Sequence, residues 1–170
     1  MARKARPRAI KLDAVDKRLL LALSCDGRRA AADLAKELGL SRQAVHERIR
    51  DLERSGVIRG YRADVDPAAL GLRIRAHVRL TMNGAAPQKE KDVLRRLMAN
   101  PLVRSVHRVS GEDCFVAQVL CRRIEDVSAL LADLQATRAI QSSRTAFVLE
   151  TVMERGGLGT VESSMLPEPA

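Results

Sequence analysis

Polar side chains able to recognise nucleic-acid bases recur between residues 41 and 54 at the spacing of a single helix face. Val45, Ile49 and Leu52 form an apolar stripe in this segment, so helical geometry turns Glu47, Arg54 and their neighbours outward, which makes them candidates for DNA contacts. Arginine can donate two hydrogen bonds to O6 and N7 of guanine, and glutamine can make a similar contact with adenine. The side chains predicted to contact bases in the major groove are Arg42, Gln43, His46 and Arg50.

Other residues of this region have more than one chemical interpretation. The hydroxyl of Ser41 is better placed to cap the helix than to read a base. Arg48 flanks the apolar stripe, which leaves both a phosphate contact and an intramolecular ion pair open. An exposed helix face is polar in any protein, so a base contact and a merely solvated position are equally supported for His46 and Glu47. The candidates for phosphate contacts, which position a protein without specifying sequence, are Arg28, Arg29, Arg59 and Arg62.

A second polar cluster surrounds a glycine between two strand-like segments. Ser110, Glu112 and Asp113 flank Gly111, whose missing side chain gives the backbone unusual freedom. Such a loop suits a zwitterion, since the acids can bind an ammonium group and backbone amides a carboxylate. From these residues alone an ordinary hairpin turn is the simpler interpretation. Cys114, beside the loop, could sense oxidation or pack as a small apolar residue, and packing is the simpler role.

Composition favours a folded, basic protein that binds a polyanion. The 170 residues carry a net charge of +9, and 46% of them are hydrophobic, enough for a packed core. The charge points to nucleic acid or an anionic membrane surface. No apolar run approaches the roughly 20 residues that span a bilayer, and the basic N-terminus lacks the apolar stretch of a signal peptide. We therefore expect a cytoplasmic, nucleoid-associated protein with reduced cysteines and no membrane partner.

The elements that must position these side chains fall into two domains of an α+β protein. Helical spacing predicts a first helix capped by Asp13, a second over 30–38 and a third over 41–54, joined as a helix-turn-helix through Gly39-Leu40-Ser41. The segment 57–65 is strand-like and could form a wing. The expected order is a basic disordered arm over 1–11, a winged helix-turn-helix over 12–66, a connector over 67–71, a second domain over 72–154 and a flexible tail over 155–170.

The second domain alternates strand and helix patterns. Residues 72–82 alternate apolar and polar side chains over six repeats, which is typical of a half-buried strand. We expect next a helix from Pro87 with a stripe of Val93, Leu94, Leu97 and Met98, strands over 102–109 and 115–121, a helix bearing Ile124, Val127, Leu130, Leu131 and Leu134, and a last strand containing 146–153. This β-α-β-β-α-β order is the ferredoxin-like arrangement. Its helices cover one sheet face, and the other must meet water or a partner, which leaves room for dimerisation.

The motifs of the first domain resemble those of a known family, the Lrp/AsnC transcription regulators. The matching residues are Leu12-Asp13-Ala14-Val15-Asp16, Gly27-Arg28, Asp33-Leu34-Ala35, Gly39-Leu40-Ser41, Val45, Arg48, Ile49, Leu52, Gly56, Val57, Ile58, Gly60 and Tyr61. The resemblance runs almost continuously from Leu12 to Gly71 and more loosely to about residue 153. It implies a sequence-specific regulator of double-stranded DNA that forms homodimers through the second domain and often assembles further, into tetramers or octamers.

The same resemblance implies that an amino acid or related small metabolite binds between second domains as effector. We expect no cofactor, and the spacing of the three His and three Cys gives no support for a metal site. The family's ligand loop typically reads Gly-x-Tyr-Asp, whereas this chain has Gly111-Glu112-Asp113-Cys114. A Thr-Ser-Thr-like triplet of the last strand corresponds to Ser143-Arg144-Thr145. The effector-binding residues that the resemblance implies are Ser110, Gly111, Glu112, Asp113, Cys114, Ser143 and Thr145.

Two other functions fit the same domain plan. Some proteins built this way decarboxylate sirohaem, a polyanion that basic side chains would bind, and His77 and His107 could serve such an enzyme. No paired catalytic residues support that alternative. A low-specificity architectural DNA-binding protein would use the same third helix and differ only in how strongly it prefers one sequence over random DNA.

Overall fold

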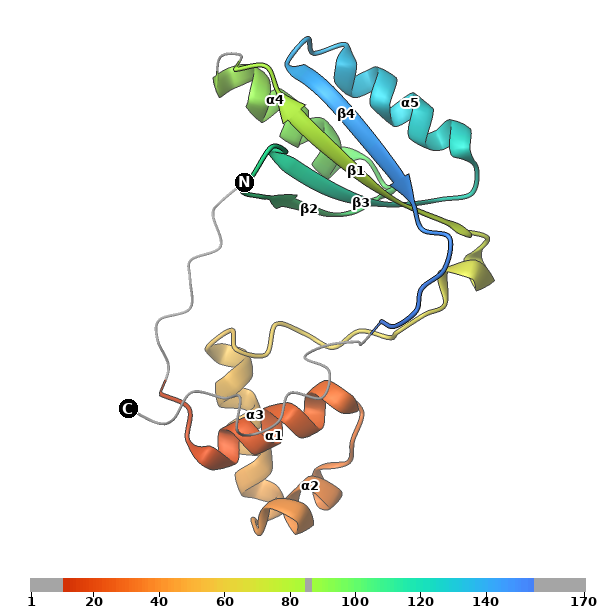
Figure 1. Cartoon of the computed structure of the whole chain (residues 1–170). Helices are drawn as coiled ribbons and strands as arrows, with labels where there is room; N and C mark the ends of the chain where they lie inside the picture. Colours follow the sequence, from red (N-terminus) through yellow and green to blue (C-terminus); the bar gives the residue numbers. More distant parts are fainter. Residues whose placement is uncertain (1–10, 85–86, 155–170) are drawn as a thin grey trace. The chain divides into compact units, whose positions relative to one another are not determined.

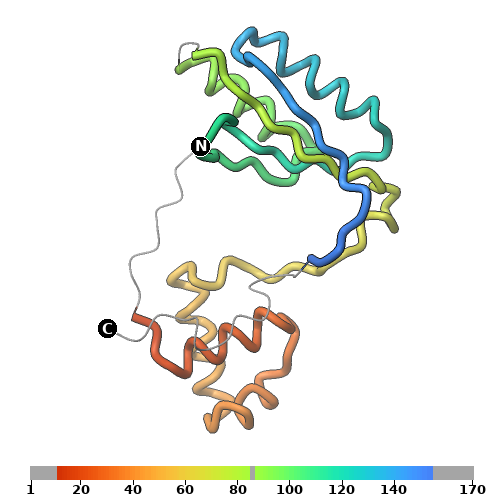
Figure 2. Tube along the Cα trace, in the orientation of Figure 1, coloured from red at the N-terminus to blue at the C-terminus, as the bar shows by residue number. Residues whose placement is uncertain are grey.

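The computed structural model describes residues 11–84 and 87–154, so the predicted arm (apart from Lys11) and the predicted tail lie outside the described residues. The chain separates into two compact units (Figures 1 and 2). One contains the described residues up to Asp64 together with Met153 and Glu154, and the other is Val65–Val152. Each unit has a hydrophobic core of its own. None of the described helices is long and apolar enough to cross a membrane.

The first unit is a bundle of three helices. They are α1 (Ala14–Cys25), α2 (Ala31–Leu38) and α3 (Arg42–Arg54). A capping box begins α1, in which the side chains of Asp13 and Asp16 each accept the backbone N–H of the other residue. The buried side chains packed between the helices are Leu19, Leu34, Ala35, Leu38, Val45 and Leu52. The helices predicted from apolar spacing are therefore confirmed.

The turn between α2 and α3 is built as the sequence predicts. Gly39 adopts the left-handed conformation after α2, with a φ of 68°, where a residue with a side chain would be strained. The N–H of Leu40 then donates to the carbonyl of Ala35 at 2.9 Å. The Ser41 hydroxyl begins α3 by accepting the N–H of Ala44 at 3.1 Å. These interactions fix where α3 starts, and hence which of its residues face outward.

The segment after α3 differs from the prediction, because no strand forms over residues 57–65. Val57 and Ile58 instead pack against the helical core, and the N–H of Ile58 donates to the carbonyl of Leu52 at 3.0 Å. Gly60 has a φ of 138°, outside the strand region. A strand also needs a neighbour to complete its hydrogen bonds, and the described part of this unit contains no other strand.

The second unit has the predicted β-α-β-β-α-β order, preceded by a short 3₁₀ helix. Its elements are η1 (Pro67–Leu70), β1 (Ile74–Met82), α4 (Pro87–Ala99), β2 (Val103–Arg108), β3 (Phe115–Cys121), α5 (Ile124–Gln135) and β4 (Ile140–Phe147). The strands form one antiparallel sheet in the order β2-β3-β1-β4. Both α4 and α5 pack on the same face of that sheet (Figure 1). The ferredoxin-like arrangement is confirmed.

Alternation along β1 separates the helix-covered face of the sheet from an open face. Ala76, Val78 and Leu80 are fully buried with residues of α4 and α5, so the side chains between them point to the open face. The register carries this division across the sheet, since Ala76 lies opposite Val119 of β3 and Val78 opposite Thr145 of β4. By this parity the open face includes Arg75, His77, Arg79, Val116, Gln118, Leu120 and Arg144.

The last strand, β4, lies earlier in the chain than the predicted range 146–153. Only the first two residues of that range belong to β4, while Leu149 and Val152 are 99% and 90% exposed. The prediction followed an apolar run of sequence. The real strand is mostly polar, because β4 is at the edge of the sheet and only part of its length touches the core.

Two residues predicted on apolar helix faces are exposed instead. Met98 of α4 and Ile124 of α5 are 59% and 54% exposed. Met98 lies about 140° around the helix from the buried Val93, beyond the edge of the stripe, and Ile124 is the first residue of its helix. The neighbouring Leu94 packs against the core as expected.

Candidate nucleic-acid interface and effector loop

The outward face of α3 presents three exposed side chains. Arg42, His46 and Arg50 lie within about 80° of one another around the helix, away from the buried Val45 and Leu52. None of the three forms a side-chain hydrogen bond or ion pair with another described residue. Because Arg42 is the first residue of α3, its guanidinium lies where a recognition helix meets base edges.

Further predicted contacts of α3 are engaged within the helix. Gln43 Nε2 donates to Glu47 Oε1 at 3.1 Å, and Arg54 forms an ion pair with Asp51. Exposed pairs three or four positions apart contribute only about 0.2–0.5 kcal/mol, so a DNA partner can displace them. The side chains of Gln43 and Arg54 thus remain available to a DNA partner, whereas Arg42 can contact DNA without an internal pair being broken first.

Arg48 lies on a different side of α3 and joins it to the start of α1. Its Nη1 donates to Asp16 Oδ1 at 2.6 Å and to Asp13 Oδ2 at 2.7 Å. The exposed fractions of the Arg48 and Asp16 side chains are 32% and 16%. The backbone N–H of Asp16, aided by Arg48, holds the pKa of Asp13 below its usual value, and the two carboxylates raise the pKa of Arg48. Of the two roles that the sequence left open, the geometry favours the intramolecular ion pair.

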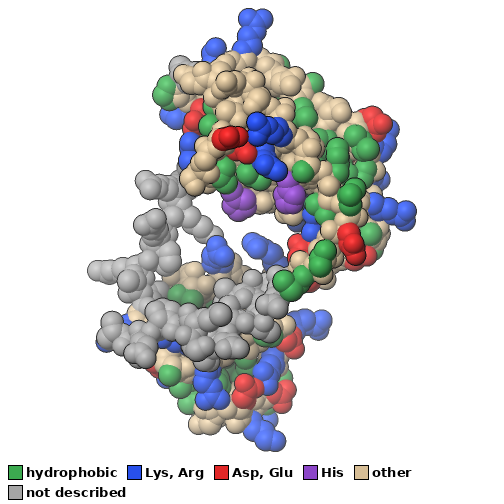
Figure 3. Space-filling model, viewed as in Figure 1, with side chains coloured by type: hydrophobic (Ala, Val, Ile, Leu, Met, Phe, Trp, Pro, Cys, Tyr) green, Lys and Arg blue, Asp and Glu red, His purple; other side chains and the backbone are tan. Residues whose placement is uncertain are grey.

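The candidates for phosphate contacts differ in their surroundings. The side chains of Arg28 and Arg59 are exposed and form no ion pair with a described residue, whereas Arg29 is paired with Glu37. The backbone N–H of Arg28 donates to the Asp26 carboxylate at 2.9 Å and shapes the turn after α1. In Figure 3 basic and acidic side chains are interspersed over the visible surface of this unit. Arg28, before α2, and Arg59, after α3, thus each present an exposed positive charge.

The loop between β2 and β3 is anchored to β1 rather than being a free hairpin turn. The N–H of Cys114 donates to the carbonyl of Leu80 at 2.8 Å, and Thr81 Oγ1 donates to the carbonyl of Glu112 at 3.4 Å. Gly111 has a φ of 115°, a conformation that favours glycine. Cys114 is partly buried against the core, consistent with packing. The loop therefore offers a backbone of defined shape.

Two arginines of the open sheet face approach the acids of this loop. Arg79 Nη1 lies 3.9 Å from Asp113 Oδ2, and Arg144 Nη1 lies 3.5 Å from Glu112 Oε2. Arg79 and Arg144 are directly opposite each other on β1 and β4, a like-charge pair that the two acids offset. The sequence analysis named Arg144 but not Arg79, although the alternation along β1 puts Arg79 on the same face as Arg75.

The remaining predicted effector residues are not brought to that cluster. Ser143 lies opposite Leu80 and Thr145 opposite Val78, so both share the helix-covered face, across the sheet from Arg144. Ser110 is exposed at the end of the loop. The structure therefore groups Glu112 and Asp113 with arginines and separates them from the two hydroxyl groups of β4.

Comparison with known proteins accounts for both units. Residues 12–59 match the family described as winged helix-turn-helix DNA-binding, and residues 75–158 match the Lrp/AsnC ligand binding domain. The first match spans α1, α2 and α3, and the second contains β2, β3 and β4. The two matched families thus follow one another in the order of the two units.

Individual relatives match both units together. The chain is 33% identical over 144 residues to the HTH-type transcriptional regulator AldR of Mycolicibacterium smegmatis, covering 84% of each chain. It is 32% identical to the leucine-responsive regulatory protein of Rhizobium meliloti, covering 85% of this chain and 94% of that protein.

Solved structures agree with these matches. The chain is similar to AsnC of E. coli, with a TM-score of 0.75 and 28% identity over 85% of this chain and 96% of that one. It shares its fold with a Neisseria meningitidis transcriptional regulator in complex with L-Met, with a TM-score of 0.81 and 24% identity over 91% and 99% of the two chains. With a matched DNA-binding unit, a matched ligand-binding unit and regulators as relatives, the chain belongs to the Lrp/AsnC family of DNA-binding transcription regulators and is not an enzyme.

Proposed function

We propose that this regulator binds double-stranded DNA sequence-specifically by placing α3 in the major groove. Arg42, Gln43, His46 and Arg50 read base edges, and Arg28 and Arg59 contact phosphates. The observation that carries the proposal is the exposed guanidinium of Arg42, which has no side-chain partner among the described residues, at the first position of a helix whose opposite side is packed. Residues 12–66 serve as the DNA-binding domain and 72–154 as the ligand-binding and oligomerisation domain.

The substitution Arg42→Ala tests this proposal. A bidentate contact to guanine discriminates against the wrong base by about 1–3 kcal/mol, so the variant should bind its selected site more weakly and tolerate changes at one base pair. Fluorescence anisotropy with a site selected from random DNA, and with single-base variants of that site, measures both effects. Arg95→Ala is the matched control, because Arg95 is an exposed arginine of α4 paired with Asp92 in the second unit.

An unchanged profile across the site variants in Arg42→Ala contradicts the proposal. The same assay separates a specific regulator from an architectural DNA-binding protein. At one salt concentration, a regulator should bind its selected site at least about a thousandfold more tightly than random DNA. Similar affinities for the two would support the architectural alternative.

We further propose that the small-molecule effector is an amino acid, bound at the Gly111 loop. The Neisseria regulator of the same fold was solved as its L-Met complex, and the loop of this chain combines backbone amides with Glu112 and Asp113. Calorimetry against the common amino acids tests the assignment. Complete absence of binding removes the effector proposal and leaves the DNA-binding proposal intact.

The proposed assembly is a homodimer through the open face of the sheet, with larger assemblies built from dimers. Neither described helix of the second unit covers this face, because α4 and α5 both pack on the other one. Val116 lies on it, opposite Arg79 and His107. Light scattering should show a dimer that Val116→Glu converts to a monomer, whereas Ser128→Glu on the exposed side of α5 should not. A dimer unaffected by Val116→Glu would contradict this assignment. Such a regulator would act in the cytoplasm, at the nucleoid.

A further inference from the structure

Two of the three histidines of the chain lie on the open face of the sheet. His77 of β1 is opposite Gln118 of β3, and His107 of β2 is opposite Val116 of β3. Figure 3 shows two histidine side chains at the surface of this unit, and the third histidine, His46, lies on α3 of the other unit. Since β3 runs between β2 and β1, His77 and His107 flank the middle of the open face.

The charge in the middle of the open face depends on these two imidazoles. The β3 side chains that point to this face, Val116, Gln118 and Leu120, are uncharged. His77 is partly buried and His107 is exposed, and neither forms a side-chain hydrogen bond or ion pair with another described residue. Histidine is the side chain that ordinarily changes charge between about pH 5 and pH 8. This central region is therefore neutral or positive according to the pH.

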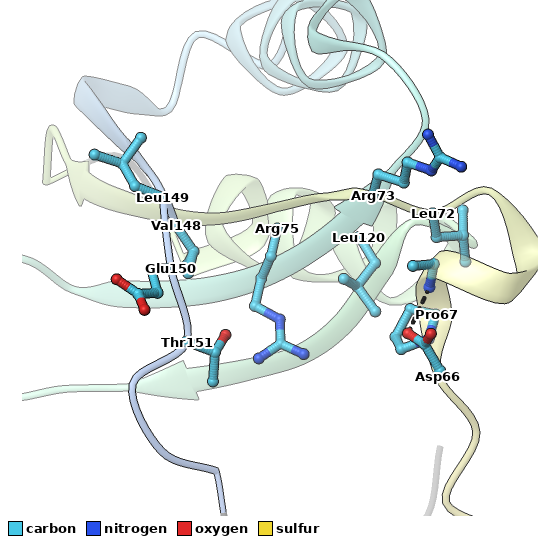
Figure 4. Close-up of a pocket in the computed structure, with 11 residues that line it drawn as sticks. Asp66, Pro67, Leu72, Arg73, Arg75, Leu120, Val148, Leu149, Glu150 and Thr151 are labelled. Carbon is cyan, nitrogen blue, oxygen red and sulfur yellow. Dashed lines mark hydrogen bonds between the residues drawn. The ribbon is translucent and has the colours of Figure 1, made fainter.

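Arginines surround the histidines on β1 and β4, and the acids of this face already have partners. On the side of the Gly111 loop, Arg79 lies 3.9 Å from Asp113, and Arg144 lies 3.5 Å from Glu112. At the other end of β1, Figure 4 shows Arg75 on the segment's inner side, near Thr151 and Glu150 of the segment after β4, and Arg75 also has an interaction partner within the chain. No acid among the described residues is paired with either histidine.

The charged groups of β2 do not neutralise His107 either. Arg108, the next residue, lies over the ring of Phe115 on the helix-covered side and is paired with Glu90 of α4. Arg104 is exposed at the β-bulge of β2 and adds a further positive charge to this edge of the sheet. Protonation of the imidazoles thus adds charge of the sign that the surrounding strands already carry.

We propose that the open face is a pH-sensitive interface between two copies of this chain, which forms while His77 and His107 are neutral and weakens when they are protonated. The inference rests on the proposed homodimer and assigns a form of regulation to it. A second copy that covers this face removes water from the imidazoles, and burial disfavours their charged form. It also brings the arginines of both copies to the same interface, while the acids that it supplies already face an arginine. Protonation therefore opposes assembly.

Separation of the two copies has a consequence for DNA binding. Helix-turn-helix proteins that form dimers bind two half-sites at once, and linking the two contacts raises the overall affinity well above that of either one. A fall in pH would separate the two DNA-binding units without any change in α3. Acid would thereby release the regulator from a site made of two halves.

The size of the effect follows from the titration of an imidazole. A histidine side chain in water is half protonated near pH 6.5, so its neutral fraction falls about tenfold between about pH 7.5 and about pH 5.5. If the interface admits only neutral imidazoles, each one that it buries raises the dissociation constant of the dimer about tenfold over that interval. One buried histidine per chain gives about a hundredfold, and two give about ten-thousandfold. Because the neutral form assembles, the dimer is favoured above about pH 6.5 and weakens as the pH falls below it.

Sedimentation equilibrium of the full chain without DNA, at about pH 7.5 and about pH 5.5, measures the ratio of the two dissociation constants. The wild type should show a ratio of about a hundred or more. His77→Gln and His107→Gln should each lower the ratio, and the double variant should bring it near one, whatever its own affinity. His46→Gln is the matched control, because it removes the remaining histidine from the other unit and should keep the wild-type ratio. Circular dichroism checks the fold of each variant.

Chemical modification of the wild type gives a second measurement that needs no variant. Diethyl pyrocarbonate acylates neutral imidazoles, and mass spectrometry of peptides follows each histidine separately. At about pH 7.5, His77 and His107 should react more slowly in the concentrated dimer than in the same protein diluted to monomers. His46 should react at the same rate in both.

Equal dissociation constants of the wild type at the two pH values would overturn the inference, and so would a double variant that keeps the wild-type ratio. Equal modification of His77 and His107 in dimer and monomer would overturn it as well. If the wild type is an equally stable dimer at both pH values and Val116→Glu is a monomer, the pH inference fails and the proposed homodimer stands. A chain that is monomeric at both pH values overturns both, and the Arg42→Ala assay still decides the DNA-binding proposal by itself.

Discussion

The contact of Arg48 with the acids of α1 predicts that this residue stabilises the DNA-binding unit and does not bind DNA. We expect Arg48→Gln to lower the free energy of unfolding of this unit and to leave the affinity for DNA unchanged below the unfolding temperature. Arg50→Gln provides the matched control. Arg50 is exposed on the outward face of α3 and has no side-chain partner among the described residues, so its substitution should weaken DNA binding without changing stability.

The size of the effect follows from the exposure of the partners. The Asp16 side chain is only 16% exposed, so its bond to Arg48 should contribute about 1.5 kcal/mol, the lower end for hydrogen bonds to charged groups. Asp13 is half exposed, and its bond should contribute about 0.5 kcal/mol after solvent screening. A loss of about 2 kcal/mol lowers the melting temperature of a domain this small by roughly 10 °C.

Calorimetry of the full chain measures this shift, because the first unit has its own core and should give its own transition. A double-mutant cycle with Asp16→Asn isolates the pair, and a coupling energy of about 1 kcal/mol or more is expected. Salt dependence provides the opposing test. Arg48→Gln with wild-type stability, weaker DNA binding and a salt slope reduced by about one would show that Arg48 contacts a phosphate, and would refute the ion-pair reasoning.

Three further predictions concern the cap of α3, the core of the second unit and the stability at acid pH. Ser41→Ala removes the hydroxyl that caps α3 and should lower the free energy of unfolding by about 1 kcal/mol in urea denaturation; no change would mean that the cap is dispensable. Leu97→Ala should cost about 2–5 kcal/mol in the same assay, whereas the exposed neighbour Met98→Ala should cost less than about 0.5 kcal/mol, and equal losses would contradict the described core. Because folding lowers the pKa of Asp13 from 3.8, its contribution to stability is complete above that pH and is lost as the pH falls below it. Between about pH 5.5 and about pH 2.5 the free energy of unfolding should therefore fall less in Asp13→Asn than in the wild type. An identical fall in both would refute the assignment.

The helices of the first unit could be predicted because their signals are local. Apolar spacing, the caps at Asp13 and Ser41 and the glycine after α2 each act within about four residues, and each forms as expected. The alternation of apolar and polar residues along β1 also allowed this strand to be predicted, because in a strand covered on one face every second side chain is buried. These signals were sufficient for the fold class and for the outward face of α3.

Features that depend on partners distant in sequence could not be read in this way. The strand β4 is polar because it has only one neighbour, and nothing in its own residues reveals that neighbour. The segment 57–65 has strand-like residues but no strand beside it in the described unit. Arg48 donates a hydrogen bond to Asp13, which lies 35 residues away in the sequence. Arg79 of β1 likewise forms an ion pair with Asp113 of the loop between β2 and β3. Local spacing therefore identified candidate side chains but could not show which already have intramolecular partners.

The polar character of β4 has a consequence for aggregation. An edge strand exposes unpaired backbone N–H and C=O groups, which could recruit further chains into a fibril. Here one edge carries Ser142 and Arg144, and the other edge, β2, carries Arg104 and Arg108. Charged side chains on an edge strand disfavour its pairing with the edge of a second molecule, so the arginines at both borders disfavour sideways polymerisation of the sheet.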